Sequence, residues 1–483
     1  MNKKLALVVV VASLLLSSVV AAQSPGPGSG WWSGEQIQNV GTDPATIMLT
    51  AYDMDSTATY EASETAASGS AYTFLPTHFP GMPDGFVGSV VVSSDQPIKG
   101  IVNVTNQPAT IGGVDLGVTG GMASAQYQGM DSPSDVLYFP LAKHDRYGNT
   151  TGFYIQNAGS AADTAVAVFS MDDGGVYTYT TPSVGAGQMV YIHPSMASVP
   201  TSNTGRANIG SLKVSASSGT PLAGAVFEQD TDEAVATVLF GTRGFTANDF
   251  DNKAYAPVVK NDRYGRFTGI QVQNVDTVPI TVDINYVGTS PNCQGVTTQD
   301  VITVDPGKST TAVSNQGNFT PNCTGAATLD GTGDFVAIVN ETNLPGYSAA
   351  GIVYSAMADA SATTKLSIPL FKDSRYAATA GLQIQNVGPA HATNVVATFS
   401  FKGAAEFTAV SDPQTITAGG GMLFYKPYSN MASAFATPFA IDSVNCAVVV
   451  TSDQPVVAIV NETSTQTPAH LDDYNYEGFN LVP

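Results

Sequence analysis

The chain of 483 residues is 43% hydrophobic and only 12% charged, and its 18 basic against 39 acidic residues give a formal net charge of −21. So negative a surface does not seek nucleic-acid phosphates or anionic lipids, and the low charged fraction excludes a coiled coil or a solvated disordered chain. At roughly 100 to 200 residues per domain, the length predicts three or four domains.

Residues 1–22 have the pattern of a secretory signal peptide. Two lysines precede an apolar run from Leu5 to Val20, and small residues lie just before Gln23. A retained membrane anchor is the weaker alternative, because the run is short for a bilayer span and a flexible Gly/Pro/Ser segment follows over 23–34. We therefore expect a secreted protein, extracellular or at the cell surface, with no membrane insertion after cleavage and no nucleic-acid partner.

Four copies of one sequence unit follow the leader. A Gln-Asn motif recurs about every 115 residues, and other landmarks return around it in the same order. Its asparagines are Asn39, Asn157, Asn274 and Asn386. We predict repeats over 35–134, 135–250, 251–362 and 363–470, and a C-terminal strand over 471–483.

The hydrophobic period within a unit is two. Thr164–Ser170, Val176–Thr180 and Thr281–Tyr286 alternate β-branched or aromatic residues with polar or small ones. Turn signals separate such runs at about ten-residue spacing, which is typical of an antiparallel sandwich. The predicted fold is all-β: tandem immunoglobulin-like antiparallel β-sandwich repeats, with no long helix.

A second recurrent motif, Arg-Tyr, lies in a predicted turn before the Gln-Asn strand of units two, three and four. Its residues are Asp145, Arg146 and Tyr147 in unit two, Asp262, Arg263 and Tyr264 in unit three, and Arg375 and Tyr376 in unit four. We predict a structural staple in which Asp accepts backbone N–H groups, Arg pairs with Asp, and Tyr packs at a domain junction. A binding site is the alternative, but it would more often occur in one unit than in three. The amides of the Gln-Asn motif are expected to satisfy backbone groups at a strand corner.

Cysteine usage fits an oxidising exterior. Cys293 and Cys323 occupy matching Pro-Asn-Cys contexts in unit three and predict a disulfide, with two free thiols as the alternative. Cys446 lies in an apolar strand and is expected to be a buried core residue.

Catalytic motifs are absent from the sequence, and the five histidines stand singly. Calcium is the one cofactor for which acidic loops offer weak candidates, a solvated loop being the alternative for each. These candidates are Asp230, Asp232, Glu233, Asp249 and Asp251.

The two ends of the chain suggest a mode of assembly. Units two to four open with a Pro-containing strand that unit one lacks, and the C-terminus resembles such a strand with no unit after it. Donation of this strand to another copy would build a head-to-tail homopolymer or lattice. The residues involved would be Trp31, Trp32, Phe479, Leu481, Val482 and Pro483. Alternatively, the C-terminal strand packs on unit four and the two tryptophans cap unit one.

The repeats together resemble secreted surface-layer, adhesin and sheath proteins built of tandem immunoglobulin-like sandwiches. The resemblance is one of architecture, and it implies a non-enzymatic structural protein of the cell exterior that assembles with itself. Two alternatives stay open: an adhesin that binds surface glycans or matrix, and a secreted hydrolase with an unrecognised site.

Overall fold

The computed structural model describes residues 11–14, 31–105, 110–111, 114–115, 123–230, 239–343, 351–373, 378–401, 407–424, 444–464 and 474–481. The chain divides into two compact halves, each larger than one repeat. The first half comprises Met1–Ser68, Tyr72–Asp249 and Gly307–Ser309, and the second half comprises Gly69–Ala71, Phe250–Pro306 and Thr310–Pro483. The all-β prediction is confirmed, because the described residues outside strands form only turns, loops and short 3-10 helices.

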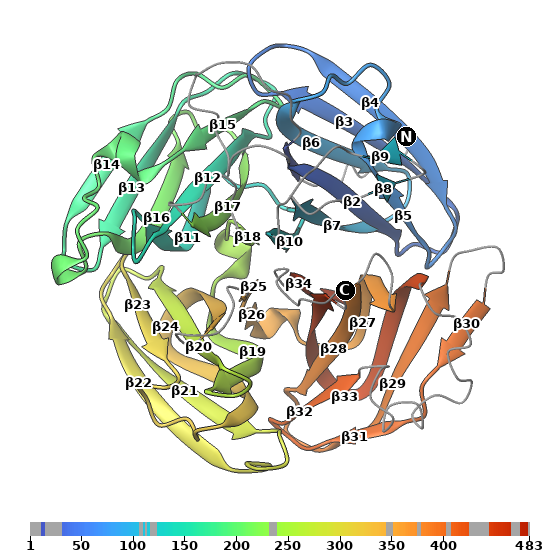
Figure 1. Ribbon diagram of the computed structural model, residues 1–483, viewed down its shortest axis with the longest axis vertical. Helices are drawn as coiled ribbons and strands as arrows, with labels where there is room; N and C mark the ends of the chain where they lie inside the picture. Colours follow the sequence, from blue (N-terminus) through green and yellow to red (C-terminus); the bar gives the residue numbers. More distant parts are fainter. Residues whose placement is uncertain are drawn as a thin grey trace. The chain divides into compact units, whose positions relative to one another are not determined.

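Each of the first two repeats consists of two four-stranded antiparallel sheets (Figure 1). In repeat 1 the first sheet has the strand order β1 (Val11–Leu14), β6 (Val87–Ser94), β3 (Ala45–Asp53), β4 (Thr59–Ala66). The second sheet has the order β10 (Ser124–Gln128), β7 (Ile98–Thr105), β2 (Trp32–Asn39), β5 (Ala71–Phe74). β8 (Thr110–Ile111) and β9 (Val114–Asp115) form a separate hairpin. In repeat 2 they are β11 (Val136–Lys143), β16 (Ile209–Ala216), β13 (Ala165–Met171), β14 (Val176–Thr180), and β15 (Met189–Ile192), β12 (Asn149–Asn157), β17 (Leu222–Asp230), β18 (Leu239–Arg243).

Repeats 3 and 4 keep this strand order, but one 21-residue strand in each runs through both layers. Repeat 3 holds β19 (Asp251–Asn261), β20 (Arg266–Asn274), β21 (Ile280–Gly288), β22 (Thr297–Val304), β23 (Ser309–Val313), the long β24 (Cys323–Asn343), β25 (Ile352–Ser355) and β26 (Met357–Ala358). Repeat 4 holds β27 (Thr363–Asp373), β28 (Ala378–Asn386), β29 (Ala392–Phe401), β30 (Phe407–Val410), β31 (Gln414–Ile416), β32 (Gly421–Phe424), the long β33 (Val444–Ser464), β34 (Tyr474–Glu477) and β35 (Phe479–Asn480). The 3-10 helices are η1 (Pro76–His78), η2 (Pro194–Ala197), η3 (Thr204–Arg206), η4 (Ala247–Asp249) and η5 (Asp359–Ser361).

The predicted period of two is visible in the burial of the strands. β13 and β21 alternate buried with half-buried residues along their whole length, whereas the edge strand β14 alternates exposed with half-buried ones. In repeat 2 the buried rings of Phe139, Phe153 and Phe169 meet between the two sheets, with centroids 5.1 and 5.9 Å apart. Burial of such alternating apolar residues is what holds the two layers together.

The recurrent proline of each opening strand coincides with a β-bulge. The register of β11 against β16 shifts between Phe139 and Ala142, which brackets Pro140. The same shift brackets Pro257 in β19 and Pro369 in β27. Because proline has no N–H to donate, a bulge is where a paired strand tolerates it.

Repeat 1 has an opening strand that the sequence did not predict. β1 pairs antiparallel with β6, Val11 lying opposite Val90. This is the place that β11, β19 and β27 take in the other repeats. The strand falls within the residues predicted to form the signal peptide, and it contains no proline and no register shift. Among the described residues, no helix is both long and apolar enough to cross a membrane.

Candidate functional site

The asparagine of each Gln-Asn motif ties together one corner of its repeat. Asn157 Nδ2 donates to the carbonyls of Ala161 at 2.7 Å and Val184 at 2.8 Å, while its Oδ1 accepts from the N–H of Gly159 at 2.9 Å. The equivalent three bonds are made by Asn39, Asn274 and Asn386. The prediction that this amide satisfies backbone groups at a strand corner is confirmed in all four repeats.

The glutamine of the motif links neighbouring repeats. Gln156 Nε2 in repeat 2 donates to Ser89 Oγ of repeat 1 at 2.9 Å and to the Gly187 carbonyl at 2.7 Å. In the second half of the chain, Gln385 Nε2 of repeat 4 donates to the Ala327 carbonyl of repeat 3 at 3.3 Å. In repeats 2 and 4 the dipeptide therefore fixes a corner through its asparagine and a contact with the preceding repeat through its glutamine.

Three repeats contain a buried ion pair that the sequence analysis missed. Lys143 Nζ lies 2.5 Å from Glu228 Oε1, Lys260 Nζ lies 2.7 Å from Glu341 Oε1, and Lys372 Nζ lies 2.6 Å from Glu462 Oε2. The Glu341 carboxylate, 2% exposed, also receives Arg266 at 2.8 Å. Burial alone would raise the pKa of Glu341, but the two cations outweigh it and hold that pKa below its ordinary value.

Repeat 1 replaces this pair with an apolar residue. Asn103 lies opposite Gly34 in the β2–β7 register, as Asn340 lies opposite Gly269 in repeat 3. The residue after Asn340 is the paired Glu341, whereas the residue after Asn103 is the fully buried Val104. The Glu that follows Ile-Val-Asn in repeats 3 and 4 was the available signal for the pair.

The Arg-Tyr motifs form the tips of two-residue β-hairpins. In repeat 2 the backbones of Arg146 and Asn149 exchange hydrogen bonds of 2.7 and 3.1 Å around Tyr147 and Gly148, whose φ angles are 55° and 80°. The guanidinium of Arg146 lies 4.3 Å from the centre of the Tyr147 ring and donates to its hydroxyl at 3.1 Å. It also donates to the Asn203 carbonyl at 3.0 Å. Two consecutive positive φ angles define a type I′ turn, which matches the twist of the strands that it joins.

Repeat 3 reproduces this tip in detail. Arg263 and Arg266 exchange two bonds of 3.1 Å around Tyr264, whose φ is 56°. Arg263 lies 4.2 Å from the centre of the Tyr264 ring, donates to its hydroxyl at 3.0 Å and binds Asn322 Oδ1 at 3.2 Å.

The predicted turn is therefore correct, but the predicted role of its tyrosine is wrong. Tyr147 and Tyr264 do not pack at a domain junction; they are 75% and 72% exposed, because the type I′ geometry points the residue after Arg into solvent. Asp145 and Asp262 also have positive φ, at 54° and 52°. Arg375 and Tyr376 lie outside the described residues.

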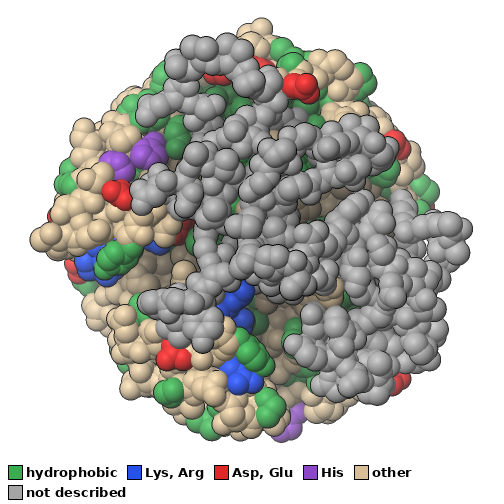
Figure 2. All heavy atoms as spheres, viewed as in Figure 1, with side chains coloured by type: hydrophobic (Ala, Val, Ile, Leu, Met, Phe, Trp, Pro, Cys, Tyr) green, Lys and Arg blue, Asp and Glu red, His purple; other side chains and the backbone are tan. Residues whose placement is uncertain are grey.

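Two histidines that are far apart in sequence meet beside the repeat 2 hairpin, contrary to the expectation that each stands alone. The rings of His144 and His193, at the ends of β11 and β15, are 5.2 Å apart, and Figure 2 shows histidine side chains close together on the face that it draws. His193 Nδ1 accepts from the Ser195 N–H at 3.2 Å, which caps η2, and Nε2 lies 2.9 Å from Thr150 Oγ1. Burial, with a smaller contribution from His144, lowers the pKa of His193 to about 4.

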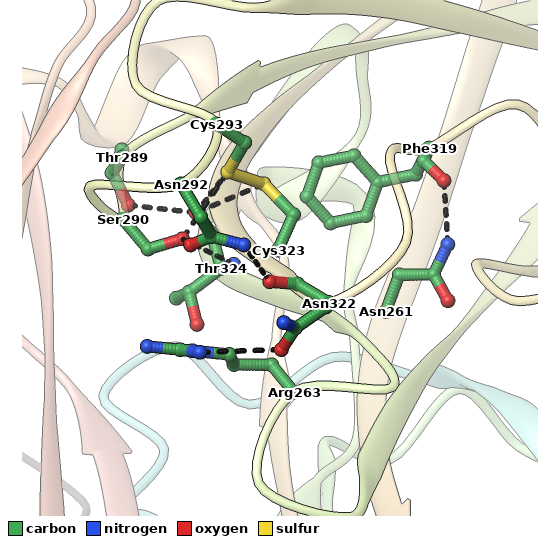
Figure 3. The surroundings of a disulfide bond; sticks show 10 residues. All are labelled: Asn261, Arg263, Thr289, Ser290, Asn292, Cys293, Phe319, Asn322, Cys323 and Thr324. Atoms are coloured by element: carbon green, nitrogen blue, oxygen red, sulfur yellow. Dashed lines mark hydrogen bonds between the residues drawn. A yellow bond between two sulfur atoms is a disulfide. The ribbon is translucent and has the colours of Figure 1, made fainter.

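The disulfide between Cys293 and Cys323 is present, as predicted, and closes a separation of 30 residues. Figure 3 shows that it lies among polar loop contacts: Ser290 Oγ accepts from the Thr324 N–H at 3.0 Å, and Arg263 reaches Asn322 beside Cys323. The bond thus holds the start of β24 to the loop after β21, next to the repeat 3 hairpin. Cys446 is buried, also as predicted.

The calcium candidates do not form an ion site among the residues that can be described. Asp249 Oδ1 and Oδ2 receive Arg243 at 2.6 and 3.0 Å, and Oδ2 also receives the Thr246 N–H at 2.8 Å. Asp251 Oδ1 accepts from the Lys253 N–H at 3.1 Å. Asp249 is thus an ion-pair partner, because Arg243 supplies the charge that calcium was expected to supply. Asp232 and Glu233 lie outside the described residues, as does the side chain of Asp230.

The C-terminal segment closes its own repeat. β34 pairs with β33 and β35 with β27, as β25 and β26 pair with β24 and β19 in repeat 3. Tyr476 is fully buried and its hydroxyl accepts from the Leu370 N–H at 3.0 Å, and the Leu481 N–H donates to Lys365 at 3.0 Å. Phe479, 8% exposed, takes the place of Met357.

Of the two interpretations left open for the chain ends, the structure shows the internal one. The segment is a closing strand, and its likeness to an opening strand of a fifth unit was misleading because both kinds of strand are short, apolar and aromatic. Trp31 is buried in the core of repeat 1, and Trp32 begins β2 opposite Thr105. Val482 and Pro483 lie outside the described residues.

Comparison with known proteins finds no matching family model and no matching curated protein. A Thermotoga maritima protein, 1070, is 9% identical, with 23% of this chain and 95% of that one covered and a TM-score of 0.20. A tetra-tandem repeat from the extending region of a large adhesion protein is 13% identical, with 98% and 100% covered and a TM-score of 0.10. Tripeptidyl peptidase 2 is 8% identical, with 72% and 37% covered and a TM-score of 0.12. Likenesses this weak assign neither fold nor function.

Proposed function

We propose that the protein is a secreted, non-enzymatic structural protein of the cell exterior, whose repeats act as rigid building blocks of a surface layer, sheath or filament. The observation that carries this proposal is the repetition of scaffold contacts. The Asn corner recurs in all four repeats and the Lys–Glu pair in three, whereas the histidine pair occurs in one. A chain selected for spacing and stiffness repeats its scaffold in this way.

Two further observations support an extracellular place. The disulfide fits an oxidising compartment, and the leader pattern over residues 1–22 fits export. Cleavage of the leader would remove β1, so repeat 1 of the mature protein would begin with β2. Self-assembly is part of the proposal; because the C-terminal strand pairs within repeat 4, we expect the contact between copies to use another surface.

The test is expression of the full chain in a secreting host. We expect the protein outside the cell, with a mature N-terminus at Gln23 by mass spectrometry and an oxidised Cys293–Cys323 pair by thiol labelling. Negative-stain microscopy of the purified protein, with and without calcium, should show filaments or sheets. An unprocessed protein that stays inside the cell would rule out the proposed location, and particles of one chain at every concentration would rule out assembly.

A second candidate, an adhesin that binds surface glycans, is favoured by one observation. Tyr147 and Tyr264 are aromatic side chains presented to solvent in the same geometry by two repeats.

A further inference from the structure

We propose that the hairpin tips formed by Arg146 and Tyr147 in repeat 2 and by Arg263 and Tyr264 in repeat 3 are binding sites for neutral polysaccharide chains. The proposal relies on the proposed function only for the extracellular setting in which such polymers are met. The ligand class follows from the conformation, the exposure and the neighbours of the two tyrosines.

The first step is the cost of placing tyrosine at these positions. The first central residue of a type I′ turn needs a positive φ, for which Asn, Asp and Gly are preferred. A bulky residue in that region is a conformational outlier, yet Tyr147 and Tyr264 adopt it at 55° and 56°. Burial of the rings does not offset this conformational strain, since the side chains are 75% and 72% exposed. An exposed ring on a strained backbone conformation points to a role other than stabilising the fold.

The second step is the orientation of the ring. Arg146 and Arg263 stack on their tyrosines at 4.3 and 4.2 Å and bind the hydroxyl groups, so each ring is held in one position before any ligand arrives. The arginine covers one side of the ring, and the exposure leaves the remainder in water. A fixed aromatic surface loses little conformational entropy on binding, and its flat apolar area matches the C–H face of a pyranose ring.

The third step is the polarity of the surroundings. Asn203 is exposed and accepts from the Tyr147 N–H through Oδ1 at 3.3 Å, and the exposed Asn322 lies under the arginine of the other tip. Amide groups beside an aromatic ring suit sugar hydroxyls, which both donate and accept. A protein-binding hot spot would instead be enclosed by contacts that exclude water.

The charge at each tip favours a neutral polymer over an acidic one. Each arginine is accompanied by an exposed acidic residue, Asp145 or Asp262, directly before it in sequence. A chain with a net charge of −21 also repels polyanions.

The experiment uses the full-length secreted protein in pull-down assays with a panel of insoluble neutral polysaccharides: cellulose, chitin, β-1,3-glucan, mannan and starch. We expect retention on at least one member of the panel. The double variant Tyr147→Asn/Tyr264→Asn supplies the residue that the turn prefers. It should bind at least about fivefold more weakly, because both hairpin tips lose the ring with which they bind the same polymer. Its melting temperature should stay within about 3 °C of the wild type.

Two control variants separate a binding role from a structural one. Tyr147→Phe/Tyr264→Phe keeps the ring and loses the hydroxyl contact with arginine, and it should retain binding. Val176→Asn changes a residue of repeat 2 that is 62% exposed and belongs to β14, not to the hairpin tip, and it should bind like the wild type.

Three results would overturn the proposal. The first is no retention on any polymer of the panel. The second is equal retention of the double Asn variant. The third is a large fall in melting temperature of the double Asn variant, which would make the tyrosine a fold staple. If the double Asn variant instead loses self-association, measured by analytical ultracentrifugation, the tips contact a second copy and the polysaccharide assignment is wrong. None of these results affects the location of the protein, which the N-terminal processing experiment tests separately.

Discussion

Repeats 1 and 3 share one recurring contact and differ in another. In both, the asparagine of the Gln-Asn motif binds two carbonyls and one N–H group. Only repeat 3 has the buried pair of Lys260 and Glu341, where repeat 1 has Val104. The corner therefore belongs to the chain path that all repeats follow, whereas the ion pair belongs to the opening strand with its proline and bulge. The two contacts are separable, and substitutions can test this.

The largest expected effect is that of Glu341→Ala. The substitution leaves Lys260 and Arg266 buried without their shared acceptor, which should lower the free energy of unfolding by about 3 to 5 kcal/mol. Val104→Ala in repeat 1 removes only two methyl groups and should cost about 1.6 kcal/mol. Unfolding in urea, monitored by hydrogen exchange in each repeat, measures both changes in the free energy of unfolding. Equal costs would mean that the apolar residue and the ion pair are equivalent solutions, and Glu61→Ala, at an exposed site, serves as the control.

The disulfide makes repeat 3 differ from repeat 1 in a second way. Replacing both Cys293 and Cys323 by Ser should lower the stability of repeat 3 by about 3 kcal/mol, because the unfolded chain regains the freedom of the closed loop. Reduction of the wild-type protein should reproduce this loss, and repeat 1 should not change. A reductant that destabilises both repeats alike would contradict the assignment.

The corner should give matched effects in both repeats. Asn39→Ala and Asn274→Ala each remove the partner of one buried and one partly buried carbonyl, which should cost about 1 to 3 kcal/mol. Asn285→Ala is the matched control, since its amide donates to Asp330 in a solvent-exposed hydrogen bond of 3.1 Å, and it should change stability by less than about 0.5 kcal/mol. Costs that differ strongly between repeats 1 and 3 would show that the corner is not a common element.

The last effect concerns pH and is confined to repeat 2. Because the folded pKa of His193 is about 4 and lies below its ordinary value of 6.5, the unfolded state binds more protons between these two values. Stability should therefore rise with pH across this window and level off above it. His193→Asn keeps an acceptor for the η2 cap and should flatten the slope measured by denaturant titrations from pH 4 to 7. An unchanged slope would assign the pH dependence to other groups.

Periodicity and repetition made much of the fold predictable. Alternation of apolar and polar residues identified the strands, and the fourfold Gln-Asn motif identified the corner, because both are local signals. The Cys pair was predictable from its matched contexts. The pairing of His144 with His193 was not, since strand order brings together residues that no spacing rule connects.

The C-terminus and the hairpin tips show a different limit. Short apolar strands look alike in sequence, so Phe479 could be assigned to an opening strand although its register is that of a closing one. The exposure of Tyr147 depends on the turn type, which two positive φ angles decide and the motif alone does not reveal.

The position of the disulfide also has a mechanical consequence. A chain of folded repeats that is pulled can lengthen by releasing folded chain, and the 30 residues between Cys293 and Cys323 correspond to about 100 Å of extended polypeptide. In the oxidised protein the disulfide prevents these residues from extending, so an unfolded repeat 3 reaches a shorter length under force than repeat 2. Reduction would release this length and make the extension of repeat 3 comparable with that of repeat 2.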